Sequence, residues 1–244
     1  MPESLKGKTV FVAGASSGMG RAIARAAAGA GADLVLLARR PDALGETAAA
    51  VRKIAPDATI AEIVTDAANA AALEAALASH RPQVETVDIL VNTIGTNIVR
   101  RAFGELTPES WTGMLDVNLT AAFNLTRFAV PLMRSRGGGL IIHIASTAAR
   151  RADRSGAAYQ AAKAGVVALT HAVMEEERVN GIRATAILPG MTDTPLLNRR
   201  PTPPTPDERA RALKPEDVAA ACLFVMQLPP HAHVAEILMQ PSQG

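Results

Sequence analysis

The only tyrosine in the chain, Tyr159, lies four residues before Lys163. Residues four apart on a helix are neighbours, so this spacing would bring a phenol and an ammonium group together. A phenol with a pKa of about 10 is a poor base at neutral pH, and a nearby cation lowers that pKa because it stabilises the phenolate. The pair could therefore move a proton on or off a substrate oxygen. A Tyr–Lys pair on a surface helix can also be purely structural, and the spacing alone leaves both interpretations open.

A serine, Ser146, ends the apolar run 140–146 and precedes Tyr159 by thirteen residues. Its hydroxyl could donate a hydrogen bond to the same substrate oxygen. The alternative is an ordinary strand-end serine that caps a turn. Taken together with the Tyr–Lys pair and a glycine-rich turn near the start of the chain, the catalytic interpretation is favoured.

That glycine-rich turn separates the first apolar run, 9–13, from an alanine-rich segment. Small residues allow the backbone to approach a pyrophosphate, and the N-terminus of a following helix offers unpaired N–H groups. The alternative is a tight strand-to-helix turn that serves packing alone. We interpret the turn as a dinucleotide-binding site formed by Gly14, Ser16, Ser17, Gly18, Met19 and Gly20.

The second apolar run ends in two arginines, Arg39 and Arg40, and no acidic residue follows before Asp42. A carboxylate at this place binds the ribose 2′-hydroxyl of NAD and would repel a 2′-phosphate, whereas a guanidinium suits phosphate. We therefore predict NADP(H) rather than NAD(H), with Arg39 as the main contact and Arg40 as a second. Two solvated arginines at a strand end are the alternative.

These residues are embedded in a regular alternation of short apolar runs and longer helical segments. The alternation predicts a Rossmann-type α/β fold, a doubly wound parallel sheet of about seven strands with helices on both faces, and one domain over 1–244. The apolar runs are 9–13, 33–38, 59–65, 88–93, 140–146, 183–188 and 234–239. The expected helices are 19–30, 42–55, 68–80, 108–135, 156–179 and 215–227.

One segment breaks this pattern, because 199–209 contains four prolines. Prolines of this density argue against a regular helix or a central strand. The segment is either an exposed loop or a flap over the substrate. We favour a flap over 195–213, since it leaves a strand at the edge where such sheets bind ligands.

The composition excludes several classes of function. The net charge is only +2, aromatic residues are 3% of the chain, and no long basic run suggests nucleic acid. No apolar run approaches the roughly 20 residues that span a bilayer, and no secretory signal is evident. The single cysteine, Cys222, cannot form an intrachain disulfide. We expect a cytoplasmic protein that binds neither membrane nor metal, with His143 in the core and His231 and His233 in a solvated loop.

Several motifs in this order resemble the short-chain dehydrogenase/reductase family, in its shorter single-domain branch. The resemblance implies hydride transfer between a carbonyl or alcohol and a nicotinamide cofactor, with Tyr159 as general acid/base. Ser146 would hold the substrate oxygen, Lys163 would also bind the nicotinamide ribose, and Asn118 would hold a water that links the lysine to solvent. The motifs are Gly14/Gly18/Gly20, Asp66, Asn92/Gly95, Asn118, Ser146, Tyr159/Lys163 and Pro189/Gly190.

The resemblance also implies further cofactor contacts, among them an adenine contact at the end of the third strand. The strand-end motif reads Asn92-Thr93-Ile94-Gly95 where the family usually has Asn-Asn-Ala-Gly, and the Asp-Gly-Gly ending common in acyl-carrier-protein reductases is absent. The implied contacts are Asp66, Ala67, Asn92, Gly95, Lys163, Pro189, Gly190, Thr192 and Thr194.

Two other functions share this fold: a catalytically silent dinucleotide sensor or scaffold, and a cofactor-free lyase such as a halohydrin dehalogenase. Both are disfavoured because the glycines, the tyrosine and the lysine are all present. The family implies a homo-oligomer, a tetramer or dimer, through the helices near 108–135 and 156–179. The substrate would lie among 96–100, 147–154 and the flap, where Arg150, Arg151 and Arg154 either attract an anion or are simply solvated.

Overall fold

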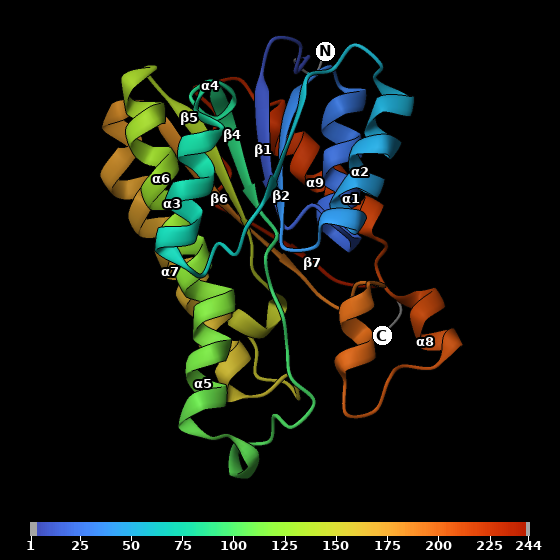
Figure 1. The fold of residues 1–244 in the computed structure, drawn as a ribbon. Helices are drawn as coiled ribbons and strands as arrows, with labels where there is room; N and C mark the ends of the chain where they lie inside the picture. Colours follow the sequence, from blue (N-terminus) through green and yellow to red (C-terminus); the bar gives the residue numbers. More distant parts are fainter. Residues whose placement is uncertain (1–3, 243–244) are drawn as a thin grey trace.

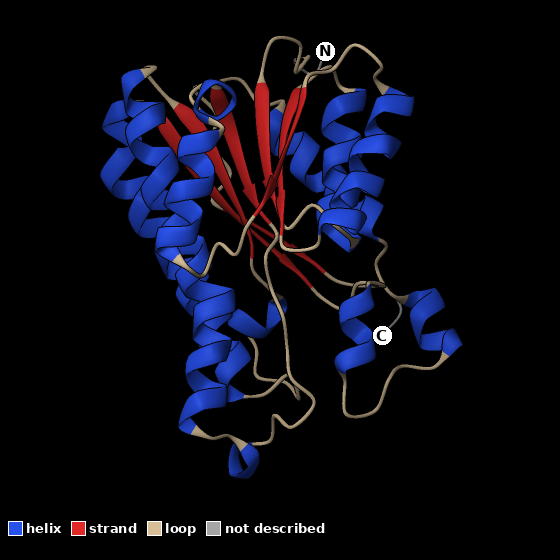
Figure 2. Ribbon diagram, viewed as in Figure 1, coloured by secondary structure: helices blue, strands red, loops and turns tan. Residues whose placement is uncertain are grey.

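The computed structural model of the protein describes residues 4–242. Its centre is a seven-stranded parallel sheet in the order β3-β2-β1-β4-β5-β6-β7, which confirms the predicted fold (Figures 1 and 2). The strands are β1 (Thr9–Ala13), β2 (Asp33–Ala38), β3 (Ile60–Val64), β4 (Val87–Asn92), β5 (Gly139–Ile144), β6 (Ile182–Pro189) and β7 (Glu236–Met239).

Helices cover both faces of this sheet, as Figure 1 shows. One face carries α1 (Gly18–Gly29), α2 (Pro41–Ile54) and α9 (Pro215–Met226), and the other carries α3 (Ala70–Ser79), α6 (Ala121–Ser135) and α7 (Ala157–Glu177). Alternate residues of each strand point to opposite faces, so Val10 and Val12 pack in the first layer and Phe11 and Ala13 in the second. Both faces are therefore buried, which is why the strands read as nearly continuous apolar runs.

The long helix expected over 108–135 is two helices. They are α5 (Pro108–Leu115) and α6, joined by a wider π-helical turn, Asp116–Thr120. Within that turn the Asn118 side chain donates to the Met114 carbonyl at 2.9 Å and accepts from the Thr96 backbone N–H at 3.0 Å. Tying an amide to a neighbouring loop in this way requires the helix to open locally. The helix α5 starts at residue 108 as predicted, and Thr107 is its N-cap.

The proline-rich segment also differs from the prediction. A short helix, α8 (Pro206–Arg211), begins inside it, and a 3-10 turn, Pro195–Arg199, precedes it. The expectation that 199–209 contains no regular helix is wrong for its last residues. Pro206 lies in the first turn, where its missing N–H costs nothing, and Thr205 caps the helix by accepting from the Glu208 N–H at 3.3 Å.

All seven strands run in the same direction, so their carboxyl ends meet at one edge of the sheet. The segments that carry α5 and α8 extend beyond this edge (Figure 1). Most of the predicted functional residues lie at or just after the ends of β1 to β6, and Tyr159 and Lys163 lie near the start of α7.

Candidate active site

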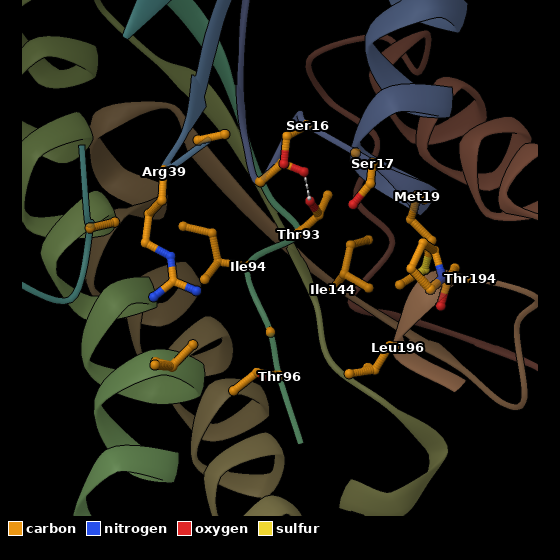
Figure 3. A pocket seen from close by; sticks show the side chains of 18 of the residues that line it. Ser16, Ser17, Met19, Arg39, Thr93, Ile94, Thr96, Ile144, Thr194 and Leu196 are labelled. Atoms are coloured by element: carbon orange, nitrogen blue, oxygen red, sulfur yellow. Dashed lines mark hydrogen bonds between the residues drawn. The ribbon is translucent and has the colours of Figure 1, made fainter. Parts of the chain in front are cut away.

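A cavity of about 340 Å³ lies at the carboxyl ends of the strands, under the glycine turn. In Figure 3, Arg39 lies on one side of this cavity and Ser17 and Met19 on the other, with Ile94 between them. Thirteen of the predicted cofactor residues line it: Gly14, Ser16, Ser17, Gly18, Met19, Gly20, Arg39, Arg40, Asp66, Ala67, Gly95, Lys163 and Thr194.

The glycine turn is packed too closely for any side chain. A Cβ at Gly20 would lie 2.2 Å from the Gly14 carbonyl oxygen, and one at Gly14 would lie 2.5 Å from Thr93 Oγ1. Gly14 also has a φ of +88°, which favours glycine. The Thr93 hydroxyl donates to the Ala13 carbonyl at 2.9 Å and so ties the turn to the end of β4. This threonine, a departure from the family motif, lines the cavity and was not predicted as a site residue.

A second residue that was not predicted, Arg21 of α1, ties the turn to α2. Its guanidinium donates to the Ser16 carbonyl at 2.9 Å, the Ala43 carbonyl at 3.2 Å and the Thr47 hydroxyl at 3.0 Å. A cation in the first turn of a helix opposes the helix dipole. That unfavourable placement, directly after Gly20, was the sequence signal for a specific role.

The two predicted cofactor arginines have different partners. Arg40 Nη2 lies 3.2 Å from the hydroxyl oxygens of both Ser16 and Ser17. Arg39 pairs with Asp66 at 3.4 Å and its side chain is 60% exposed. Because this ion pair is solvated, its contribution to stability is small and Arg39 is free to exchange partners.

The structure does not bring every predicted cofactor residue to this cavity. The Asn92 side chain is buried, where its oxygen accepts from the Ile94 N–H at 3.0 Å and its nitrogen lies 3.3 Å from His143 Nδ1. Asn92 therefore shapes the turn after β4 and does not line the cavity. Pro189, Gly190 and Thr192 line an adjoining cavity of about 560 Å³ instead.

These observations test the site against a nicotinamide dinucleotide. Gly14, Gly18 and Gly20 give the turn a backbone without side chains of their own, followed by the N-terminus of α1. Two hydroxyls and Arg40 converge beside it. Small residues, backbone N–H groups and a nearby cation are what a pyrophosphate requires, so the residues present fit this group.

Tyr159 lies between the two cavities and lines both of them. Ser146 lines the adjoining cavity, and Lys163 lines the first. The Lys163 ammonium is buried, donates to the Ile144 carbonyl at 2.9 Å, and lies 5.9 Å from the centre of the Tyr159 ring. Ser146 Oγ also accepts from the Ala148 N–H at 3.2 Å, so the turn-capping alternative is realised as well. The structure thus brings three of the four predicted catalytic residues, Ser146, Tyr159 and Lys163, together.

The space for the lysine depends on Gly95. A Cβ at that position would lie 3.1 Å from Lys163 Nζ and 3.2 Å from Asn118 Oδ1. Asn118 is buried and makes the two hydrogen bonds that hold the π-helical turn, so its amide is close to the lysine without lining either cavity.

The prediction that Lys163 lowers the pKa of Tyr159 is wrong for the protein chain by itself. Burial raises the pKa of Tyr159, while the Ser146 hydroxyl and the cations Arg101 and Arg200 act in the opposite direction. The Lys163 ammonium is turned to the Ile144 carbonyl, and burial lowers the pKa of Lys163 to about 8. The phenol is therefore neutral at neutral pH and placed to donate a proton.

The adjoining cavity is lined by the segments that were expected to contact the substrate, with some differences in the residues. Asn97 comes from the loop after β4, Asp153 and Arg154 from the loop after β5, and Arg200 from the flap. Arg150 and Arg151 do not line it, and Arg150 pairs with Glu236. Arg101, one residue beyond the expected loop 96–100, does line it and was missed. The segment 195–213 also contributes to the first cavity, where Arg199 Nη1 donates to Thr96 Oγ1 at 2.9 Å.

The remaining histidines and the thiol stand apart from the site. His143 is fully buried, as predicted, and Cys222 is a buried free thiol. His231 and His233 are exposed and lie outside helices and strands, as predicted, and His233 Nε2 lies 2.8 Å from the Ala184 carbonyl oxygen. Across residues 4–242, no three His, Cys, Asp or Glu side chains are grouped so that they could hold a metal ion. None of the helices in this part of the chain is both long and apolar enough to cross a bilayer.

Comparison with known proteins agrees with this geometry. The family model described as short chain dehydrogenase matches residues 8–204. The chain is 31% identical over 237 residues to an uncharacterised oxidoreductase of Staphylococcus saprophyticus, covering 97% of this chain and 98% of that protein. It is 35% identical over 199 residues to a D-beta-hydroxybutyrate dehydrogenase of Cupriavidus necator, covering 80% of this chain and 75% of the relative.

Solved structures are similar over nearly the whole chain. Levodione reductase has a TM-score of 0.89 at 26% identity, covering 98% of both chains. An alcohol dehydrogenase from Thermococcus sibiricus complexed with 5-hydroxy-NADP has a TM-score of 0.86 at 27% identity, covering 97% of both chains. Carveol dehydrogenase from Mycobacterium avium in complex with NAD also has a TM-score of 0.86 at 27% identity, covering 96% of both chains.

The buried His143 yields a prediction about pH. Its Nδ1 faces the Asn92 amide nitrogen at 3.3 Å and its Nε2 faces Thr126 Oγ1 at 3.1 Å, and that hydroxyl donates onward to the Ala122 carbonyl. The neutral ring with a proton on Nε2 satisfies all of these contacts, and burial followed by the Lys163 charge lowers the pKa of His143 to about 4. The unfolded chain, with an ordinary histidine, therefore takes up this proton first as the pH falls.

The titration of His143 should therefore lower the free energy of unfolding by about 2 kcal/mol between pH 7 and pH 4.5. The stabilisation by the neutral ring is fully present above the ordinary histidine pKa of about 6.5. Urea titrations across this range should show a shallower decline for His143→Gln than for the parent. The exposed His231 offers the control, since His231→Gln should leave the decline unchanged. Equal declines in the parent and His143→Gln would contradict the assignment.

Proposed function

The chain belongs to the short-chain dehydrogenase family and is an oxidoreductase that acts on an alcohol or carbonyl group, and from this premise we propose that it interconverts a carbonyl and a secondary alcohol with NADP(H), using Tyr159 as general acid/base. The observation that carries the proposal is the position of Tyr159, whose side chain lines both the cavity under the glycine turn and the adjoining one. A cofactor in the first and a substrate in the second would meet at the phenol.

The bound nicotinamide supplies or accepts the hydride. In the reductive direction the substrate carbon gains that hydride, and the oxygen must gain a proton to become a hydroxyl. Ser146 donates a hydrogen bond to the oxygen, and Tyr159 donates the proton. In the oxidative direction Tyr159 takes the proton back. Because burial raises the pKa of Tyr159, the phenol is protonated at rest, which suits reduction.

Lys163 and Asn118 support this transfer. One N–H of the ammonium is used by the Ile144 carbonyl, and Lys163 lines the cofactor cavity, so its remaining N–H groups are available to a ribose. Asn118 holds the π-helical turn against the loop of Thr96, close to the lysine. We assign Asn118 to a water relay that returns a proton to Tyr159 through Lys163, as the family resemblance implies.

NADP(H) is favoured by the charges at the end of β2. No carboxylate ends this strand, so a 2′-phosphate would meet Arg39, with Arg40, which contacts Ser16 and Ser17, as a second cation close by. The acid in this region, Asp66, is paired with Arg39. The similar structures include both an NADP-type complex and an NAD complex, so the preference rests on these side chains and not on the family.

We further propose that 195–213 forms a flap over the substrate, supported by the contribution of Leu196, Leu197 and Arg200 to the adjoining cavity. A homo-oligomer, dimer or tetramer, is supported by the partly exposed aromatic residues Trp111 on α5 and Phe123 on α6. Light scattering of the purified protein should give two or four times the monomer mass, and a monomer at micromolar concentration would rule this out. A cytoplasmic location accords with a single cysteine.

A catalytically silent dinucleotide binder is the second candidate. It would keep the cofactor cavity and have no use for a phenol and a serine facing the adjoining one. Both are present here and line that cavity, which favours the enzyme.

Replacing Tyr159 by phenylalanine tests the catalytic role. The ring and its packing remain while the proton donor is removed, so the turnover number should fall by about 10²- to 10⁴-fold with a reducible ketone. NADPH affinity, measured by fluorescence titration, should stay within about threefold, since a phenol contributes little to cofactor binding beyond one hydrogen bond. Full retained activity in Tyr159→Phe would refute the assignment. Lost NADPH binding would show that the variant is damaged elsewhere.

Reversing the charge of Arg39 tests the cofactor preference. The KM for NADPH should rise by about 10- to 100-fold in Arg39→Asp, because a charge-assisted contact to phosphate is lost and a repulsive one is gained. The KM for NADH should stay constant or fall. Arg40→Ala should raise the KM for NADPH by a smaller factor. The matched control is Arg25→Asp, an exposed arginine of α1 outside the cavity. An unchanged ratio of the two KM values in Arg39→Asp would defeat the proposal.

A further inference from the structure

Two side-chain polar atoms in residues 4–242 are fully buried and have no hydrogen-bond partner: Arg101 Nε and Ser155 Oγ. Both residues line the adjoining cavity, together with Tyr159 and Ser146. Buried polar groups in proteins are almost always paired, because leaving one without a partner costs the full desolvation of that group. Both atoms are closed to solvent, so a ligand in the cavity would pair with them once the two side chains turn towards it.

Arg101 is the more demanding of the two. The residue is only 8% exposed, and no hydrogen bond or ion pair joins its side chain to any described residue. A guanidinium cannot discard its proton to escape burial, so the charge is retained. Burial without a counter-charge is costly, and an anion in the cavity would remove that cost.

The charges around Arg101 do not supply this counter-charge. The cavity walls carry three arginines, Arg101, Arg154 and Arg200, against one acid, Asp153. Asp153 acts on Arg101 over a distance without forming an ion pair, and Arg200 repels it. The cavity therefore has an excess of positive charge on the side that faces the substrate.

The backbone fixes Arg101 relative to the catalytic phenol. Gly156, three residues before Tyr159, has a φ of +93°, and a Cβ there would lie 2.6 Å from the Arg101 carbonyl oxygen and 3.0 Å from its Cβ. Only glycine allows this contact between the loop of Arg101 and the start of α7. Asn97 ties the same two segments, since its side-chain nitrogen donates to the Ser155 carbonyl at 2.9 Å.

We propose that the substrate is a small oxo acid or hydroxy acid whose carboxylate binds Arg101 and Ser155, while its carbonyl or hydroxyl oxygen lies at Ser146 and Tyr159. This inference rests on the proposed oxidoreductase function and adds the chemical class of the substrate. A guanidinium presents two parallel N–H groups to the two oxygens of a carboxylate, and Arg101 would turn its buried Nε towards the cavity to offer one of them. Arg200 lies on the flap, so its charge would draw the flap towards the same anion.

The kinetic test compares acids with neutral substrates of the same shape. The probes are short 2-, 3- and 4-oxo acids, their methyl esters, and one ketone that carries a phosphate ester, each followed by NADPH absorbance. The parent enzyme should have a kcat/KM at least about 10-fold higher for one of the acids than for its ester. Arg101→Met should lose about 100-fold in kcat/KM with that acid, mainly through KM, and lose little with the ester. The loss of kcat/KM with that acid should be smaller in Ser155→Ala than in Arg101→Met.

Three controls keep the outcome interpretable. Arg101→Lys keeps the charge and should recover part of the activity with the acid. Arg151→Met removes an exposed arginine outside the cavity and should behave as the parent. The melting temperature without ligand should stay constant or rise in Arg101→Met, because an unpaired buried charge is removed. A large fall in melting temperature would instead assign Arg101 to the structure and overturn the proposal.

A binding measurement separates this inference from the proposed function. Butyrate, an unreactive carboxylate, should raise the melting temperature of the parent in the presence of NADPH, and butyramide should not. Arg101→Met should lose the response. If no carbonyl compound is turned over while this response is present, the oxidoreductase proposal fails and the carboxylate site stands. If ketones and esters are reduced as well as acids, or the phosphate ester is preferred, the carboxylate assignment fails and the oxidoreductase stands.

Discussion

The hydrogen bond from the Lys163 ammonium to the Ile144 carbonyl joins the two elements that carry the catalytic residues. Lys163 lies on α7 one turn after Tyr159, and Ile144 ends β5 two residues before Ser146. A buried ammonium needs a partner, and a backbone carbonyl at the end of a central strand does not move. The bond therefore fixes the position of α7 against β5 and, with it, the phenol against the serine hydroxyl. Gly95 makes room for this bond, because a larger residue would occupy the space of the ammonium.

This arrangement changes the role expected for the lysine. A cation beside a phenol lowers its pKa, which is the usual argument for a Tyr–Lys pair. Here the ammonium is directed at the carbonyl, and burial dominates the pKa of Tyr159 and raises it. Lys163 acts on the phenol mainly by placing it. The cations that do lower the pKa of Tyr159 are Arg101 and Arg200, which come from the substrate side.

The sequence was sufficient to predict what depends on local pattern. Parallel strands covered on both faces give apolar runs, so the sheet and the edge that holds the site were predicted correctly. Glycine spacing predicted the turn, although only the Cβ excluded at Gly20 by Gly14 is a contact within the same strand–turn–helix unit, and the one excluded at Gly14 by Thr93 is not. The wrong placement of Asn92 and the omission of Arg21 and Arg101 have a common reason. Their partners, or lack of partners, are set by segments distant in sequence, such as His143 for Asn92 and α2 for Arg21. The split of 108–135 has the same origin, since the π-helical turn is required by the loop at Thr96.

The positive charge on the substrate side also connects binding to the direction of proton transfer. Arg101 and Arg200 lower the pKa of Tyr159, whereas burial raises it. A carboxylate bound at Arg101 would neutralise part of this positive field and exclude water, and both effects favour the neutral phenol. The proton donor would then be held in its protonated form when an oxo acid occupies the cavity. Release of a hydroxy acid would restore the positive field and make the phenol more acidic. The phenol would then exchange its proton more readily through the proposed relay at Lys163. In this way one unpaired guanidinium would serve both to select the substrate and to adjust the acid that reduces it.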